Sequence, residues 1–329
     1  MRRILGSVLI GLGLFGIVLA ILLPTVVVSG SKKTPLDLNI TLHSTGSAQV
    51  LNAATGKVSD VNLRATRIVR SDSKASDGKK TTVDETLCTV IVQGDTADCL
   101  RAPDPRLLSI TTDRVTSDRR SAEAVHVAKY KENVNGDASK RHTGMAYKWP
   151  IDAKKKTYQF YEPDLAKAFP AAYKGTSKIK GLTVYEYVCD TGTQPYQVQG
   201  LFPGTYTDTR TVYVEPQTGA IIKGVEHQVL ALADGQVALD TTLTFDQKAI
   251  DYQANFAKDK IKALHLAQIW GPIVVGVLGI GALVGGFLLL RTRRGLDGNS
   301  DGDARLGRPT PDDPQAYDDT PLLSGNSQT

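Results

Sequence analysis

Two long apolar runs lie at the two ends of the chain. Residues 4–28 and residues 269–290 contain no charged side chain, and each run exceeds the roughly 20 apolar residues needed to cross the hydrocarbon core of a bilayer. The first run is longer than the apolar stretch of a cleaved signal peptide, about 7–15 residues, and it offers a poor cleavage site. We therefore predict an uncleaved signal anchor over residues 1–30, with cleavage as the alternative, and a second transmembrane helix over residues 269–290.

Basic residues flank both apolar runs on their outer sides. Arg2 and Arg3 precede the first run, and Arg291, Arg293 and Arg294 follow the second. The positive-inside rule assigns such clusters to the cytoplasm. Both termini are therefore predicted to be cytoplasmic, the chain between the spans extracytoplasmic, and the location the plasma membrane.

The chain between the two runs alternates apolar and polar residues, which is typical of half-buried strands. Residues 58–69, for example, place Val61, Leu63 and Ala65 on one face. Further strands are predicted over residues 86–92, 182–189, 211–214 and 221–232, with an aromatic hairpin over residues 147–161 and a two-turn helix over residues 163–173. The predicted fold class is α+β, with a β-rich antiparallel extracytoplasmic domain over residues 31–245.

After residue 245 the apolar residues follow a helical period instead of the alternation of a strand. Asp246 can cap a helix. Apolar residues then recur at spacings of three and four, at positions 252, 256, 257, 261 and 264. This pattern predicts an amphipathic stalk helix over residues 246–268 that leads into the second span.

The junction between this helix and the second span carries its own signal. Trp270 lies where an interfacial aromatic residue belongs, and Gly271 and Pro272 follow it. Pro272 lacks the N–H that would bond to the carbonyl of Gln268, and its ring clashes with that carbonyl. We predict a hinge at Gly271 and Pro272.

The tail over residues 291–329 is rich in Asp, Gly, Pro and Ser and poor in large apolar residues. Such a segment cannot bury enough surface to fold, so we expect a disordered cytoplasmic tail. Residues 297–303 match the first half of a calcium loop, but its twelfth position is Arg308 instead of Glu, and we expect no metal there. The net charge of +5 on 329 residues is modest and gives no reason to expect nucleic acid as a partner.

The three cysteines all lie in the central region, where an extracytoplasmic location permits disulfides. Cys88 and Cys99 flank a good turn sequence at residues 93–96, so we predict a disulfide between them and a free Cys189. The alternative is three reduced, buried thiols that act as small apolar side chains.

Small residues four positions apart occur in both apolar runs. They are Ser7 and Gly11 in the first run and Gly281 and Gly285 in the second. Such pairs allow two helices to approach closely, within one chain or between chains. The alternative is that these residues face lipid.

The sequence contains no pattern of a known catalytic or cofactor chemistry. It has no nucleophile elbow, no P-loop and no Cys or His spacing of a zinc site. The five histidines stand at isolated positions along the chain. We therefore predict a protein that is not an enzyme, with no catalytic, cofactor-binding or metal-binding residues.

Several short motifs of the central region occur together in a known family. They lie at residues 112–125, 147–151 (Tyr-Lys-Trp-Pro-Ile), 181–185 (Gly-Leu-Thr-Val-Tyr) and 214–219 (Val-Glu-Pro-Gln-Thr-Gly). With the two apolar runs, they resemble an actinobacterial membrane-protein family of unknown function that carries the PorA porin name, over about residues 1–290. The resemblance implies an envelope protein of a high-GC Gram-positive bacterium, and it transfers no catalytic residues.

Two functions of different classes fit this organisation. The aromatic strands and the tether at both ends favour a non-enzymatic domain that binds or carries an envelope lipid or glycolipid next to the bilayer. The small-residue faces favour the alternative, a structural or assembly factor that holds membrane-protein partners. An apolar tunnel that opens toward the membrane would favour the first function.

Overall fold

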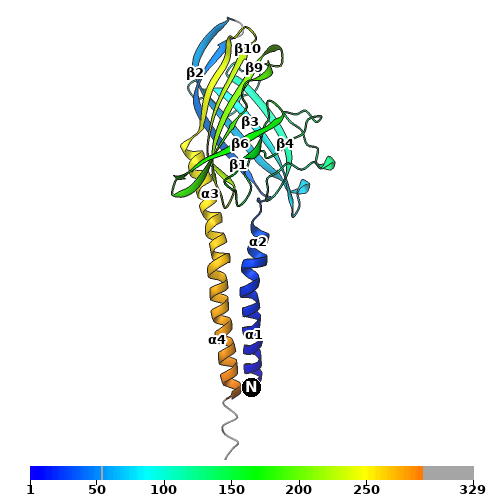
Figure 1. Cartoon of the computed structure of the whole chain (residues 1–329), viewed down its shortest axis with the longest axis vertical. Coiled ribbons are helices and arrows are strands. Elements are labelled where there is room, and N and C mark those ends of the chain that lie inside the picture. The colour runs from blue at the N-terminus through cyan, green and yellow to red at the C-terminus, as the bar shows by residue number, and fades with distance from the viewer. Residues whose placement is uncertain (53–54, 292–329) are drawn as a thin grey trace, which may run out of the picture.

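The computed structural model describes residues 1–52 and 55–291, so the calcium-like loop and the rest of the tail lie outside the described residues. A β-domain lies at the end of two long helices that run side by side (Figure 1). On the N-terminal side, α1 (Arg2–Leu22) continues through a π-helical turn at Leu23–Val27 into α2 (Val28–Ser31). On the C-terminal side, α3 (Gln247–His265) continues through a π-helical turn at Leu266–Trp270 into α4 (Gly271–Arg291).

Within the described residues, eleven strands form one antiparallel sheet. The strands are β1 (Asn39–Asn52), β2 (Lys57–Asp72), β3 (Lys80–Ile91), β4 (Leu107–Asp118), β5 (Tyr158–Glu162), β6 (Lys167–Ile179), β7 (Leu182–Asp190), β8 (Gln194–Val198), β9 (Phe202–Glu215), β10 (Ala220–Leu232) and β11 (Val237–Phe245). Their order is β4-β3-β2-β1-β11-β10-β9-β7-β6-β5, and β8 pairs with β9. The first and the last strand of the domain are therefore neighbours near the middle of the sheet.

The sheet follows from the alternation in the sequence. In β2, Leu63 and Ala65 are buried on one face while Arg64 between them is only half-buried, because successive side chains of a strand point to opposite faces. The predicted pairing of residues 211–214 with residues 221–232 is present as part of β9 and β10. The predicted α+β class with an antiparallel β-rich domain is confirmed.

Two predictions between residues 147 and 173 are wrong. Residues 147–151 form no strand, and Tyr147 has a left-handed φ of 64°, so the aromatic hairpin is absent. The predicted helix over residues 163–173 is replaced by β6, in which Phe169 and Ala171 are buried alternately. Hydrogen bonding of β6 to both β5 and β7 outweighs the local helical signal.

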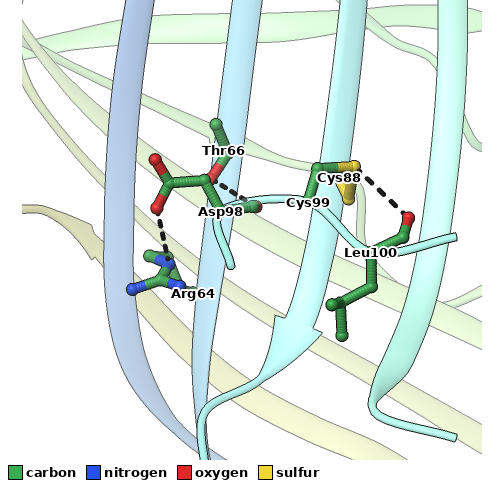
Figure 2. Close-up of a disulfide and its surroundings, with 6 residues drawn as sticks. All are labelled: Arg64, Thr66, Cys88, Asp98, Cys99 and Leu100. Atoms are coloured by element: carbon green, nitrogen blue, oxygen red, sulfur yellow. Dashed lines mark hydrogen bonds and ion pairs between the residues drawn. A yellow bond between two sulfur atoms is a disulfide. The ribbon is translucent and has the colours of Figure 1, made fainter. Parts of the chain in front are cut away.

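The disulfide between Cys88 and Cys99 is present, with a Cα–Cα distance of 5.6 Å. Figure 2 shows that it ties the loop between β3 and β4 to β3, while Asp98 of the same loop contacts β2. The Thr66 hydroxyl donates to the Asp98 carbonyl at 2.8 Å, and Arg64 Nε lies 3.3 Å from Asp98 Oδ1. Cys189 is a free, buried thiol, and burial raises its pKa to about 12.

Helix α3 joins the sheet to the C-terminal long helix. Asp246 Oδ1 accepts a hydrogen bond from the Ala249 N–H at 2.7 Å, as expected of an N-cap residue. Ala254 and Ala257 are fully buried against the sheet, where they pack with Val184 of β7 among others. One face of α3 is thus fixed to the β-domain.

Candidate ligand cavity

The curved sheet surrounds a cavity of about 850 Å³, within the range of roughly 300–1,000 Å³ that is usual for small-molecule sites. Strands from both halves of the sheet and helix α3 line it. Much of the lining is aliphatic or aromatic, including Leu42, Leu63, Val83, Leu230, Leu239, Leu243, Phe256 and Leu264. Such walls suit an apolar chain.

The cavity extends along the strands. On β1 its lining includes Ile40, Leu42 and Ser44 and, further along, Val50 and Leu51. The positions from 40 to 51 span roughly 36 Å at about 3.3 Å per residue. At one end, the lining includes Val28 of α2 and Ala267 of the π-helical turn below α3. The cavity therefore reaches the point where the two long helices join the β-domain.

A belt of charged side chains interrupts the apolar walls, and Arg210 of β9 is its main cation. The guanidinium lies 2.7 Å from Glu226, 2.9 Å from Glu162 and 3.3 Å from Asp208. Burial alone would raise the pKa of Glu226, but Arg210 outweighs burial and lowers it. Burial raises the pKa of Asp208 to about 9. Arg210 thus keeps only part of this carboxylate cluster ionised near neutral pH.

The β2–β4 side of the cavity contributes the second part of the belt. Arg67 donates to Glu85 at 2.8 Å, and burial raises the pKa of Glu85 to about 7. Asp113 of β4 accepts from the Tyr147 hydroxyl and lies 3.2 Å from His142 Nε2. The side chains of the belt already pair with one another through hydrogen bonds and ion pairs, so the belt forms a fixed polar wall.

Two hydroxyls on the cavity wall, those of Thr81 and Tyr161, lack a partner in the described part of the chain. The Tyr161 hydroxyl is buried and makes no hydrogen bond there. A buried polar group without a partner costs about 1–3 kcal/mol. This hydroxyl is therefore available to a polar group in the cavity. Among the residues described, no group of three or more His, Cys, Asp or Glu could hold a metal ion.

The charged belt was not found from the sequence, although a signal exists. Arg67 stands between the inward residues Ala65 and Val69 of a strand, and all three line the cavity. Likewise Glu226 falls between Gly224 and Gln228 on the inward face of β10. A charged residue in register with the apolar face of a strand is the pattern that could have revealed the belt.

The predicted packing residues lie outside the contact between α1 and α4. Ser7 is exposed, and a Cβ built on Gly11, Gly281 or Gly285 would meet nothing within 4 Å. These four residues remain a prediction for packing between chains.

The contact itself uses other glycines. Gly6, Gly13 and Gly16 of α1 are buried, as are Gly279 and Gly286 of α4. A Cβ on Gly13 would lie 2.7 Å from the Gly279 carbonyl oxygen, so only glycine permits this approach. The seven-residue spacing of Gly6 and Gly13, matched by Gly279 and Gly286, was the signal for this face.

The predicted hinge residues follow directly after a π-helical turn. The chain is helical from Gln247 to Arg291, and the turn at Leu266–Trp270 precedes Gly271 and Pro272. A π-helical turn is one of the known ways in which a helix adjusts to an interrupted series of backbone hydrogen bonds. Trp270 is 61% exposed on the helix surface. Motion at the hinge and the interfacial role of Trp270 remain predictions.

The fold and the cavity together define a class of protein. A curved antiparallel sheet around an apolar cavity is joined to two helices, Arg2–Val26 and Gln247–Arg291, that are long and apolar enough to cross a membrane. The chain belongs to the Porin PorA family, whose model matches residues 5–288, as the resemblance of its motifs indicated. It is therefore a membrane protein of the cell envelope.

Two relatives carry the name of the family. A Porin PorA of Corynebacterium amycolatum is 22% identical, over 87% of this chain and 98% of the relative. A Porin PorA of Corynebacterium resistens is 25% identical, over 57% of this chain and 52% of the relative. The similarity to the first relative extends over nearly its whole length.

Proposed function

We propose that the β-domain binds or carries an amphipathic lipid or glycolipid of the cell envelope in its cavity, without catalysis. The observation that carries this proposal is the cavity itself, which extends along roughly 36 Å of strand, has apolar walls that only the charged belt interrupts, and reaches the ends of the long helices. A lipid chain could thus pass from a bilayer around the helices into the domain without crossing water.

The apolar contact area offers enough free energy for such binding. Each buried methylene contributes about 0.8 kcal/mol, so ten methylenes contribute about 8 kcal/mol. The loss of translational and rotational freedom offsets several kcal/mol of this gain. An affinity in the micromolar to millimolar range is expected from the chain alone, and polar contacts of the headgroup add to it.

The proposal can be tested by filling the cavity. Ser44 of β1 lines the cavity, whereas Thr45 is exposed on the opposite face of the same strand. The full chain is purified from its membrane, and co-purified lipid is measured by mass spectrometry. We expect Ser44→Trp to lose the bound lipid and the matched control Thr45→Trp to keep it, with both variants folded by circular dichroism. Equal lipid content in the two variants would contradict the proposal.

The membrane topology is part of the proposal. The N-terminal end of α1 and the C-terminal end of α4 lie at the same end of the helix pair, away from the β-domain (Figure 1). This arrangement supports cytoplasmic termini and an extracytoplasmic β-domain in the plasma membrane. Labelling of single cysteines at residue 2 and at the exposed position 178 of β6 in intact cells tests it. A membrane-impermeant reagent should reach only residue 178, and labelling of residue 2 alone would reverse the topology.

The name of the two relatives suggests a second candidate, the passage of solutes through the membrane. The described long helices are apolar and pack on each other through glycines, so a polar pore would need several chains around it. Conductance of planar bilayers that contain the purified chain is the test. Steps of conductance that persist in Ser44→Trp would favour a pore over the lipid-binding cavity.

The scaffold alternative rests on the four small residues that face away from the helix pair. Ser7, Gly11, Gly281 and Gly285 would then contact other membrane proteins. Cross-linking in native membranes should trap such partners, and replacement of Gly11 and Gly285 by Leu should abolish the cross-links.

A further inference from the structure

Cationic side chains gather where α2 enters the β-domain. Lys32, Lys33 and Lys148 line the same cavity as Val28 of α2. Arg119 lies beside them, because its Nε donates to the Thr34 carbonyl oxygen at 2.7 Å. We call Lys32, Lys33, Thr34 and Lys148 the basic mouth of the cavity.

The positive charge of the basic mouth is only partly neutralised. Lys32 pairs with Asp152 at 2.9 Å. Lys148 donates instead to the neutral Thr34 hydroxyl. Within the described ranges, neither Lys33 nor Lys148 has a carboxylate within 4.0 Å. Two lysines at the mouth are thus without a direct anionic partner.

Lys148 is also partly withdrawn from water. Burial lowers the pKa of Lys148 to about 8, while Asp118 opposes and Arg119 adds to this effect. A desolvated cation gains most from a nearby anion, because the low local dielectric strengthens their attraction. The mouth is therefore an environment in which an added anion would be bound favourably.

The interior of the cavity has the opposite character. The belt contains two cations, Arg67 and Arg210, among the carboxyl groups of Glu85, Asp113, Glu162 and Glu226. These cations are already bound to carboxylates of the protein. An anionic headgroup is thus attracted at the mouth and repelled at the belt, which gives an amphiphile a defined orientation.

We propose that the cavity takes an amphiphile with an anionic headgroup of the phosphate type, held at the basic mouth by Lys33 and Lys148, since the Thr34 hydroxyl already donates to the Arg119 carbonyl. Its apolar chain lies along the apolar lining, which includes Val83, Phe256 and, at the level of the belt where it pairs with Arg67, Leu42. This inference rests on the proposed function, since it specifies the headgroup of the bound lipid and its place in the cavity.

The test compares two ligands that share one chain and differ only in the headgroup. Equilibrium binding of oleyl phosphate and of oleyl alcohol is measured with the purified full chain in nonionic detergent. We expect oleyl phosphate to bind at least about tenfold more tightly, because charge-assisted hydrogen bonds are roughly twice as strong as neutral ones. Lys33→Gln and Lys148→Met together should reduce this preference to within about twofold, while the alcohol is unaffected.

A matched control variant separates a local effect from a general loss of charge. Lys178 of β6 is exposed and lies outside the cavity lining, so Lys178→Gln should leave both affinities unchanged. A loss of binding for both ligands in the mouth variants would indicate a structural role of the lysines and overturn the inference. Equal affinities of the two ligands for the unmodified chain would overturn it as well.

Two further outcomes show whether the proposed function or only the assignment of the headgroup is wrong. If neither oleyl phosphate nor oleyl alcohol binds, the proposed function fails together with the inference. If inorganic phosphate alone binds the mouth as tightly as oleyl phosphate, the site belongs to a free anion, and the assignment to a lipid headgroup is wrong.

Discussion

Removal of the Arg210 cation gives the sharpest test of how the cavity wall is held. Arg210→Met keeps most of the side-chain volume and removes the charge that contacts Glu162, Glu226 and Asp208 at 2.7–3.3 Å. Breaking a buried ion network by removal of one partner costs about 3–5 kcal/mol, because the remaining charges stay buried. We expect a loss of this size in the free energy of unfolding at pH 8.

The loss should shrink as the pH falls. In the unmodified chain Arg210 outweighs burial and lowers the pKa of Glu226, so this carboxyl stabilises the fold above its unfolded pKa. Without Arg210, burial raises its pKa above the unfolded value, and the folded state then takes up a proton that the unfolded state has lost. Between the pKa of a carboxyl in the unfolded variant and its higher pKa in the folded variant, the free energy of unfolding rises by about 1.4 kcal/mol for each unit by which the pH falls. The difference from the unmodified chain is therefore largest at pH 8 and smallest near pH 5.

Urea unfolding of the full chain in detergent, in a Trp270→Phe background so that the fluorescence comes from the buried Trp149 alone, measures this effect. Arg210→Lys keeps the charge and should show a smaller loss that varies little with pH. Arg106 pairs with Asp104 outside the cavity, so Arg106→Met serves as a control without a measurable change. If the loss in Arg210→Met is the same at pH 5 and pH 8, the assumption that this cation holds buried carboxylates ionised is refuted.

Three further predictions concern other parts of the fold. Replacement of Cys88 and Cys99 by Ser opens a loop with a sequence separation of 11 residues, which should lower the free energy of unfolding by about 3 kcal/mol in denaturant titrations; an unchanged midpoint would count against this loop closure. Gly13→Val should destabilise the helix pair by about 1–3 kcal/mol in thermal unfolding, because its side chain meets α4, whereas Gly11→Val, in open space, should have no such effect. Burial raises the pKa of Glu85 to about 7, so this group should reduce stability as the pH rises from 4.5 to 7, by up to about 3 kcal/mol. Glu85→Gln should flatten the pH dependence in that range, and an unaltered profile would exclude Glu85 as its source.

The sequence predicts the elements with strong local signals. The strand around Leu63 follows from simple alternation, and the helix after Asp246 follows from a cap and a period of three and four. The disulfide follows from two cysteines on either side of one turn. In each case the residues that decide the structure are close to one another in the sequence.

The remaining features depend on contacts between distant residues. The segment around Pro170 resembles a short helix until its pairing with β5 and β7 is known. The sequence alone does not predict the cavity, because its walls come from strands that are far apart in the chain. A tunnel could be stated only as a feature that would favour lipid binding. Arg210 and Glu162 are 48 positions apart, and only the sheet order brings them together.

The pairing of β1 with β11 has a consequence for biosynthesis. Strands β1 to β4 are successive neighbours in the sheet and can associate as soon as they are made. Val50 of β1, however, pairs with Leu239 of β11, which is synthesised roughly 190 residues later, or about 10–40 s at ordinary translation rates. During that interval the free edge of β1 is open to other chains. A nascent chain that stops before β11 would therefore be prone to aggregation. In the completed chain, the edge of β1 is covered only when β11 pairs with it.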